Sequence, residues 1–323
     1  MKRFISIAFS VLLLSVIYSK IDFPKLVQVF QNCDGWWMAI SLGMVVPLTM
    51  LTAWRLQQLM PPSGAQGSSA LGFGEANRLI LVASVLNMVL PSKMGDIAKA
   101  YFMKERGHLS GSLSLSLVVF EKACDMLSLL LWCAFGLMLY PSKDWLFWVM
   151  TASVTFGLLA GLLLLSSRRF AQLFFVLASA KAPKKLRSKL EKLRGSWSEM
   201  HDYFWRDKGQ LLKITSTSIF IWFLHLLQIW FFILALKAWT PMLANLALAP
   251  LAILAGLLPL TFAGIGTRDA ALIMFYQPYF NAPTAAALGL LCTSRYLLPA
   301  IGGLPFLGQY LSTLRMRSLP SRF

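Results

Sequence analysis

Two clusters of glycine and charged residues interrupt long apolar stretches of this chain, and each follows a Leu-Pro pair. Proline removes a backbone donor and glycine adds no packing, so a helix breaks at such a point. In lipid, the freed backbone groups are tolerated only where protein buries them or where they line a wet cavity. Broken segments at corresponding places in two halves indicate a transporter's substrate site. The residues of these breaks are Pro91, Ser92, Lys93, Gly95 and Asp96, and Pro259, Gly264, Gly266, Arg268 and Asp269.

Charged residues also interrupt the apolar helices themselves, and ionisable groups inside a membrane are functional candidates by default. Glu121, Lys122 and Asp125 lie in one predicted helix, and Arg295 lies in the last one. Together with Arg268 and Asp269 these charges sum to zero, so an alternative is that they only form salt bridges between helices. Lys122 and Asp125 are three residues apart and can pair. We predict a structural ion pair for these two and a substrate-binding role for the others.

The chemistry that these breaks favour is the binding of an anion. Helix N-termini and exposed backbone amides attract anions, phosphate in particular, and Lys93, Arg268 and Arg295 would stand beside them. A phosphate-containing head group is what a lipid flippase must carry across the apolar core. Asn87, just before the first break, and Glu121 complete the predicted binding set.

The elements that position these residues are transmembrane helices. Hydrophobic residues make up 57% of the chain and charged residues 13%, whereas a soluble domain carries about a quarter charged residues. We predict an all-α polytopic membrane protein with about six full spans and two re-entrant hairpins, each hairpin helix being too short to cross about 30 Å of lipid. The spans are expected at 4–19, 36–53, 110–139, 145–167, 213–237 and 284–311, and the hairpins at 77–90 with 95–104 and 245–258 with 267–279.

The distribution of lysine and arginine predicts that both termini are cytoplasmic, because cytoplasmic loops carry an excess of these residues. The two hairpins then enter from opposite faces, which is the inverted repeat typical of alternating access. We therefore expect a single domain over 1–323 in a bacterial or archaeal cytoplasmic membrane, with halves 1–167 and 213–323. The linker over 168–212 is strongly basic. Its amphipathic segment 181–197 is expected to lie on the inner leaflet, and docking of a partner protein is the alternative.

Several functional classes are disfavoured. Cys33, Cys124, Cys133 and Cys292 show no metal-binding spacing, and the histidines are scattered. No metal, no cofactor and no catalytic residues are predicted, so we do not expect an enzyme. The net charge of +17 is interpreted as a topology signal and an attraction to anionic lipids, and not as nucleic-acid binding.

The stretch from Asn87 to Ala100, with Pro91, Lys93, Gly95, Asp96 and Lys99, resembles a signature of the transmembrane domain of lysylphosphatidylglycerol synthases and its stand-alone flippase-like relatives. Glu121 with Asp125 resembles that family's Glu-Arg-x-x-Asp pattern, with Lys122 in place of arginine. The sequence from Pro259 to Asp269 resembles its late Gly-x-Gly-x-Arg-Glu motif, with Asp269 in place of glutamate and a longer spacer. The resemblance implies a flippase-like role. No room remains after residue 311 for an aminoacyl-transferase domain, so lipid aminoacylation is not expected.

The leading hypothesis is a lipid flippase that moves an anionic phospholipid or a polyprenyl-phosphate-linked lipid between leaflets. The alternative is a non-catalytic accessory or scaffold subunit of a membrane glycosyltransferase or lipid-modifying enzyme. An integral-membrane transferase is the weakest option, because the sequence shows no metal-binding acidic pair and no nucleophile with a base. Membrane lipids are thus the expected partners, and the sequence leaves a homodimer open.

Overall fold

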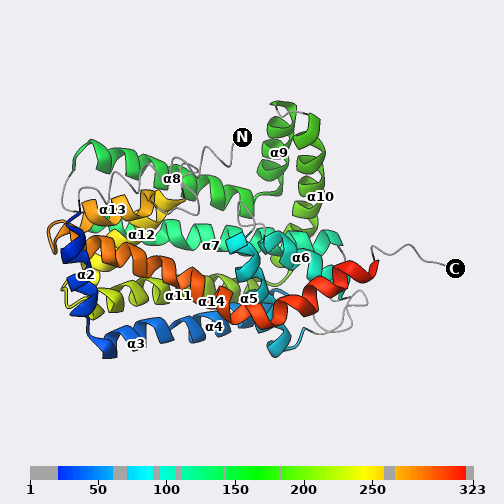
Figure 1. Cartoon of the computed structure of the whole chain (residues 1–323). Coiled ribbons are helices and arrows are strands. Elements are labelled where there is room, and N and C mark those ends of the chain that lie inside the picture. Colours follow the sequence, from blue (N-terminus) through cyan, green and yellow to red (C-terminus); the bar gives the residue numbers. More distant parts are fainter. Residues whose placement is uncertain are drawn as a thin grey trace. The chain divides into compact units, whose positions relative to one another are not determined.

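The computed structural model describes residues 21–60, 71–89, 95–106, 109, 111–140, 143–181, 184–257 and 266–317, and the regular elements in these ranges are all helices. Five helical stretches there are long and apolar enough to cross a membrane. They lie in α3 (Gly35–Gly43) with α4 (Val45–Leu59), α7 (Gly111–Leu139), α8 (Trp145–Ser166), α11 (Lys208–Ala235) and α14 (Ala282–Arg317) (Figure 1). The predicted all-α membrane class is confirmed. The predicted helix over 4–19 lies outside the described residues.

Two pairs of shorter helices take the places of the predicted hairpins. The first pair is α5 (Phe73–Val89) with α6 (Gly95–Glu105), and the second is α12 (Met242–Gly256) with α13 (Thr267–Tyr276). The helices of each pair pack against each other. The existence of the pairs was therefore predicted correctly, whereas their re-entry into a membrane stays a prediction.

The described chain divides into two compact units, and each unit consists of three segments of the sequence. The long helices α7 and α14 begin in the unit of the preceding short pair and continue into the other unit. The units therefore do not coincide with the predicted halves, and the single domain stays a prediction. The α5–α6 unit comprises Thr49–Leu127, Phe156–Ile219 and Pro299–Phe323, and the α12–α13 unit comprises Met1–Leu48, Ser128–Thr155 and Phe220–Leu298.

The core of the α5–α6 unit is apolar and tightly packed. Leu56 of α4, Leu79 of α5 and Met103 of α6 are almost completely buried. Between membrane helices, such packing is stabilised by van der Waals contacts and not by the removal of apolar surface from water. Gly303 of α14 lies so close to α5 that a Cβ atom there would overlap the carbonyl oxygen of Leu81. Glycine is thus required for this close approach of two helix backbones.

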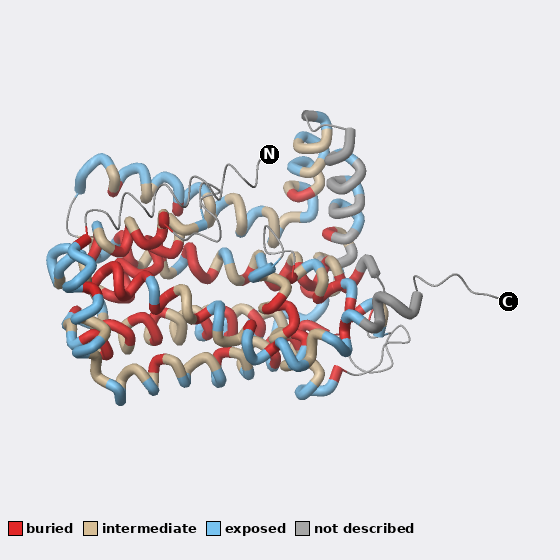
Figure 2. Tube along the Cα trace, in the orientation of Figure 1, coloured by how far each residue is buried: buried red, intermediate tan, exposed pale blue. Residues whose placement is uncertain are grey.

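The core of the α12–α13 unit is built around α12, which is buried from Asn245 to Ile253 (Figure 2). Asn245 donates a hydrogen bond of 2.9 Å to the carbonyl of Leu226 and accepts one of 2.7 Å from the hydroxyl of Tyr276. A buried amide would be costly without such partners. At Gly136 of α7 a Cβ atom would overlap the carbonyl oxygen of Ala247. This contact matches the close approach of Gly303 to α5 in the other unit.

The predicted basic linker is a pair of helices. α9 (Arg168–Lys181) and α10 (Lys184–Arg206) pack side by side. From residue 184 onward, the amphipathic segment predicted over 181–197 lies in α10, which continues to Arg206, and α9 was not predicted. A short helix α2 (Phe23–Gln31), with Asp22 as its N-cap, was not predicted either.

Candidate functional site

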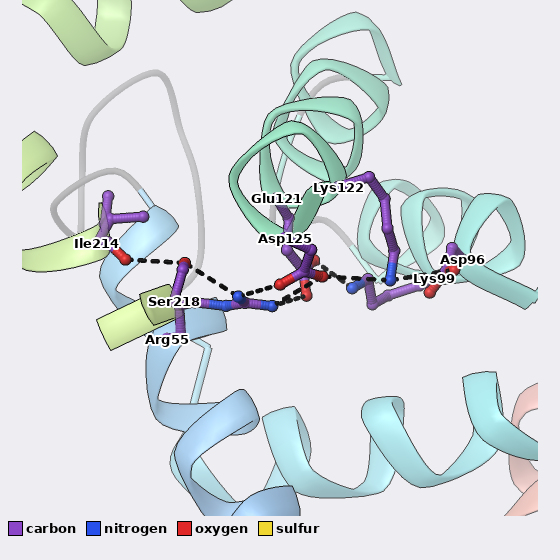
Figure 3. Close-up of polar contacts among 8 residues, drawn as sticks. All are labelled: Arg55, Asp96, Lys99, Glu121, Lys122, Asp125, Ile214 and Ser218. Carbon is purple, nitrogen blue, oxygen red and sulfur yellow. Dashed lines mark hydrogen bonds and ion pairs between the residues drawn. The ribbon is translucent and has the colours of Figure 1, made fainter. Parts of the chain in front are cut away.

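A network of charged side chains lies in the interior of the α5–α6 unit (Figure 3). Its centre is Glu121 of α7, which is 1% exposed. One carboxylate oxygen accepts from Arg55 Nη2 of α4 at 3.1 Å. The other accepts from Lys99 Nζ of α6. One carboxylate therefore joins three helices, α4, α6 and α7.

The network continues toward the surface of this unit through Asp125, one turn further along α7. Asp125 accepts a hydrogen bond of 2.5 Å from Arg55 Nη1, which also donates to Ser218 Oγ of α11 at 3.0 Å. Lys122 Nζ lies 3.2 Å from Asp96 Oδ2 and 3.7 Å from Asp125 Oδ2. The Lys122 side chain is 46% exposed, in contrast to the buried Arg55 and Glu121.

The charges of this network balance. It contains three cations and three carboxylates, namely Arg55, Lys99 and Lys122 with Asp96, Glu121 and Asp125. Buried ions lose their hydration, and only close pairing and hydrogen bonding offset that cost. Among the described residues, each acid of the network is therefore paired, and the network connects α4, α6, α7 and α11 with no net charge.

A second group of charges lies in the α12–α13 unit, at the start of α13. Arg268 Nη2 donates to Asp269 Oδ1 at 2.7 Å, to the carbonyl of Gly289 at 3.0 Å and to Thr293 Oγ1 at 2.8 Å. Arg268 Nε also donates to Asp269, at 3.1 Å. These bonds use Nε and Nη2 of the guanidinium and not Nη1.

Glycines make room for this pair. Gly266, at the N-terminus of α13, has a φ of 107°, which only glycine adopts readily, and its backbone N–H donates to Asp269 Oδ2 at 3.0 Å. A Cβ atom at Gly289 of α14 would lie 2.8 Å from Asp269 Oδ1, and one at Gly256 would lie 2.8 Å from Arg268 Cβ. The positions of Arg268 and Asp269 therefore depend on backbone that approaches from two other helices.

Arg295 of α14 differs from the other buried cations of the described chain in its surroundings. The residue is 8% exposed, and its Nη1 donates to the carbonyl of His225 at 3.3 Å. Its Nε is buried without a hydrogen-bond partner in the described structure, as is the Nε of Arg55, but none of the ion pairs found there includes Arg295. Arg268, Arg295 and Asp269 together leave one positive charge in excess. Both arginines line a small cavity with Ile229, Ile253, Leu272, Cys292 and Tyr296.

Comparison with known proteins identifies the family. The family model of the lysylphosphatidylglycerol synthase TM region matches residues 3–303. The chain belongs to this family. A similar protein is the UPF0104 membrane protein MJ1595 of Methanocaldococcus jannaschii, which is 21% identical over 94% of this chain and 93% of its own length. The resemblance inferred from the sequence motifs is thereby confirmed, and the chain is a membrane protein of the lysylphosphatidylglycerol synthase TM-region family.

The predicted site residues of this TM-region protein fall into two sets, one in each unit. Asn87, Gly95, Asp96, Glu121, Lys122 and Asp125 belong to the α5–α6 unit, where Gly95 lies against Asn87 and the carbonyl of Ala83. Gly266, Arg268, Asp269 and Arg295 belong to the α12–α13 unit. Five further residues lie outside the described ranges, namely Pro91, Ser92, Lys93, Pro259 and Gly264.

Some residues of these clusters were not predicted from the sequence. Arg55 and Lys99 were not among the predicted site residues, and the structure shows both of them buried in ion pairs. Lys99 could have been predicted as a site residue, because it is part of the sequence signature that resembles the TM-region family. Thr293 and Gly289, which contact Arg268 or Asp269, carry no signal of their own in an apolar helix. The residues that the structure describes contain no group of histidine, cysteine and carboxylates that could hold a metal ion.

Proposed function

We propose that this protein moves a lipid with a phosphate-containing head group between the two leaflets, and that Arg295 receives the phosphate. The observation that carries the proposal is the buried guanidinium of Arg295, which belongs to none of the ion pairs of the described structure and lines a cavity together with Arg268. A buried cation without a carboxylate is costly in a membrane protein. An anionic ligand would supply the missing charge.

The chemistry of the cavity fits a lipid head group. The guanidinium presents planar N–H donors that match phosphate oxygens. The other lining residues are mostly apolar, as expected for a passage that also accepts the acyl or polyprenyl part of a lipid. The cavity has room for about one water molecule, so a phosphate can enter only when the surrounding helices separate. This requirement is consistent with a transporter that alternates between closed and open states.

Membership of the TM-region family supports a lipid-related role. The resemblance of the sequence motifs to those of flippase-like relatives is a further argument for the proposal. The contacts of Arg268 assign it a different part from the one predicted. Because Asp269, Gly289 and Thr293 already occupy two of its nitrogens, we propose that Arg268 shapes the cavity and that Arg295 makes the principal contact. The network around Glu121 is proposed to hold the helices of its unit and to bind no substrate.

The test is transport by the purified protein in liposomes that contain a fluorescent lipid. The rate at which the label moves between leaflets is measured with an impermeant quencher, for phosphatidylglycerol, phosphatidylcholine and a polyprenyl phosphate in separate arms. We expect Arg295→Gln to lower the rate by about 10–100-fold, because a charge-assisted hydrogen bond contributes about 1.5–3 kcal/mol. Arg295→Lys should recover part of it, since a point charge does not reproduce the planar donor set.

The matched control is Lys25→Gln, which removes one positive charge from an exposed position in the same unit. It should leave the rate unchanged. Unchanged transport by a folded Arg295→Gln protein would remove Arg295 from the site. If the unaltered protein moves none of the lipids, the flippase proposal is wrong, and the accessory role in a membrane complex becomes the better explanation.

A further inference from the structure

The segment between the third and fourth candidate spans, α8 and α11, forms a pair of helices whose base is fixed to the end of α8. Only Ser167 separates α8 from α9, and its hydroxyl accepts a hydrogen bond of 3.2 Å from the N–H of Phe170 as an N-cap. N-capping of this kind stabilises the start of a helix. The chain therefore turns sharply where α8 ends, without a flexible linker.

Three ring donors of α10 bind the last carbonyls of α8. Trp197 Nε1 donates to Leu164 at 3.1 Å, Trp205 Nε1 donates to Leu165 at 2.8 Å, and His201 Nε2 lies 3.4 Å from the carbonyl of Ser166. The final carbonyls of a helix have no partner within the helix. The three rings are spaced by four residues and so share one face of α10. This face secures α10 to α8.

The outer face of α9 is apolar and uncovered in the described structure. Leu173 and Leu177 are each 56% exposed, and Phe174 and Val176 are exposed beside them. The opposite face is packed, since Ala171 is fully buried and the ring of Phe175 lies 5.8 Å from that of Trp197. The exposed side of α9 is therefore formed by large aliphatic and aromatic residues, and the sequence alone did not predict this exposed apolar face.

We propose that α9 inserts this face into the surface layer of an anionic bilayer, with α10 beside it. The pair runs across the direction of α7 and α8, as Figure 1 shows for the parts of these helices in the same unit. Because α7 and α8 are candidate spans, a pair that crosses them at the end of α8 lies along the membrane surface. The exposed Leu159, Leu162 and Leu163 of α8 lead directly to α9, so the apolar surface is continuous.

The charge of α10 identifies the kind of membrane. From residue 181 to residue 194 the sequence has seven lysines and arginines and one acid, Glu191. Arg187 and Arg194 are exposed, and Glu191 lies 3.3 Å from Arg187 Nε. Basic residues next to an inserted apolar face are attracted to anionic head groups. Indole rings such as Trp205, which is partly exposed, favour the interface between water and lipid.

The test uses spin labels on the full-length protein in vesicles of phosphatidylcholine with phosphatidylglycerol. Labels are attached at Leu177→Cys and Leu173→Cys after replacement of the four native cysteines. We expect both labels to collide more often with oxygen, which concentrates in lipid, than with a water-soluble nickel complex. A label at Glu191→Cys on α10 is the matched control and should show the opposite order.

Replacing phosphatidylglycerol by phosphatidylcholine should move the label at residue 177 toward water, because the attraction of the basic segment is lost. Labels at residues 173 and 177 that report water in anionic vesicles would overturn the proposal and would indicate that a partner protein covers this face in the cell. Immobilised labels shielded from both reagents would also overturn it, in favour of contact with a second copy of the chain. These outcomes do not depend on lipid transport.

Discussion

At the scale of single residues, the two groups of buried charges differ in balance. In the α5–α6 unit, each carboxylate of the network has a cationic partner, and Glu121 has two such partners, Arg55 and Lys99. In the α12–α13 unit, Asp269 is paired with Arg268, and Arg295 has no carboxylate in the described structure. A balanced network serves to hold helices, whereas an excess cation beside a cavity can serve an anionic ligand. The two groups therefore lead to different predictions for loss of charge.

Removal of the central carboxylate should destabilise the α5–α6 unit. Glu121→Gln leaves Arg55 and Lys99 buried with one acid fewer, and breaking such a pair costs about 3–5 kcal/mol. We expect a lower folded yield and a lower melting temperature, measured by the intrinsic tryptophan fluorescence of the purified protein. Lys99→Met combined with Glu121→Gln should restore much of the loss, because Arg55 keeps Asp125 as its partner.

The control for this prediction is Glu75→Gln. Glu75 lies 2.9 Å from Arg106, but both side chains are about one-third exposed, at 28% and 31%. Ion pairs of this kind contribute about 0–1 kcal/mol. If Glu121→Gln and Glu75→Gln had equally small effects, the central network would not hold the unit together.

At the scale of elements, glycines set the distances between helices in both units. The last part of α14 approaches α5 through Gly303, and the last part of α7 approaches α12 through Gly136. In each case a long helix meets the backbone of the first helix of a short pair. Small residues at helix contacts are typical of membrane proteins, because they allow backbones to approach closely. The two contacts are equivalent in kind, which supports the proposed internal repeat.

Adjacent glycines of α14 allow this contact to be tested. A Cβ atom at Gly303 would overlap the carbonyl of Leu81, whereas one at Gly302 has only Leu81 Cδ2 nearby, at 3.7 Å. We expect Gly303→Ala to lower the melting temperature by an amount equivalent to about 1–3 kcal/mol, as overpacking does. Gly302→Ala should be neutral or slightly stabilising, since alanine favours helix. Equal melting temperatures for the two variants would contradict the close approach of α14 to α5.

At the scale of the whole molecule, the sequence predicts the class of the fold and the places of the helix pairs, because the Leu-Pro breaks and the lengths of the apolar runs are local signals. It does not predict which charges meet. Arg55 and Glu121 are 66 residues apart and belong to different helices. Nor does the sequence reveal that Arg295 has no carboxylate partner in the described structure, since the six charges first singled out sum to zero. The exposed face of α9 was missed because exposure depends on the packing of α10.

The inverted repeat is the prediction that concerns the whole molecule. If the two short pairs enter the membrane from opposite sides, Ser92→Cys should react with an impermeant thiol reagent only from the cytoplasm and Thr267→Cys only from outside. The background lacks Cys33, Cys124, Cys133 and Cys292, of which the last three are buried. Arg187→Cys and Lys143→Cys serve as controls for the cytoplasmic and the external side, in intact and in permeabilised cells.

Labelling of both breaks from one side would mean that the two helix pairs enter the membrane from the same side. That result would exclude alternating access by opposed hairpins. Labelling from opposite sides would support an inverted repeat, because a lipid that enters from either leaflet would then meet an equivalent pair of short helices.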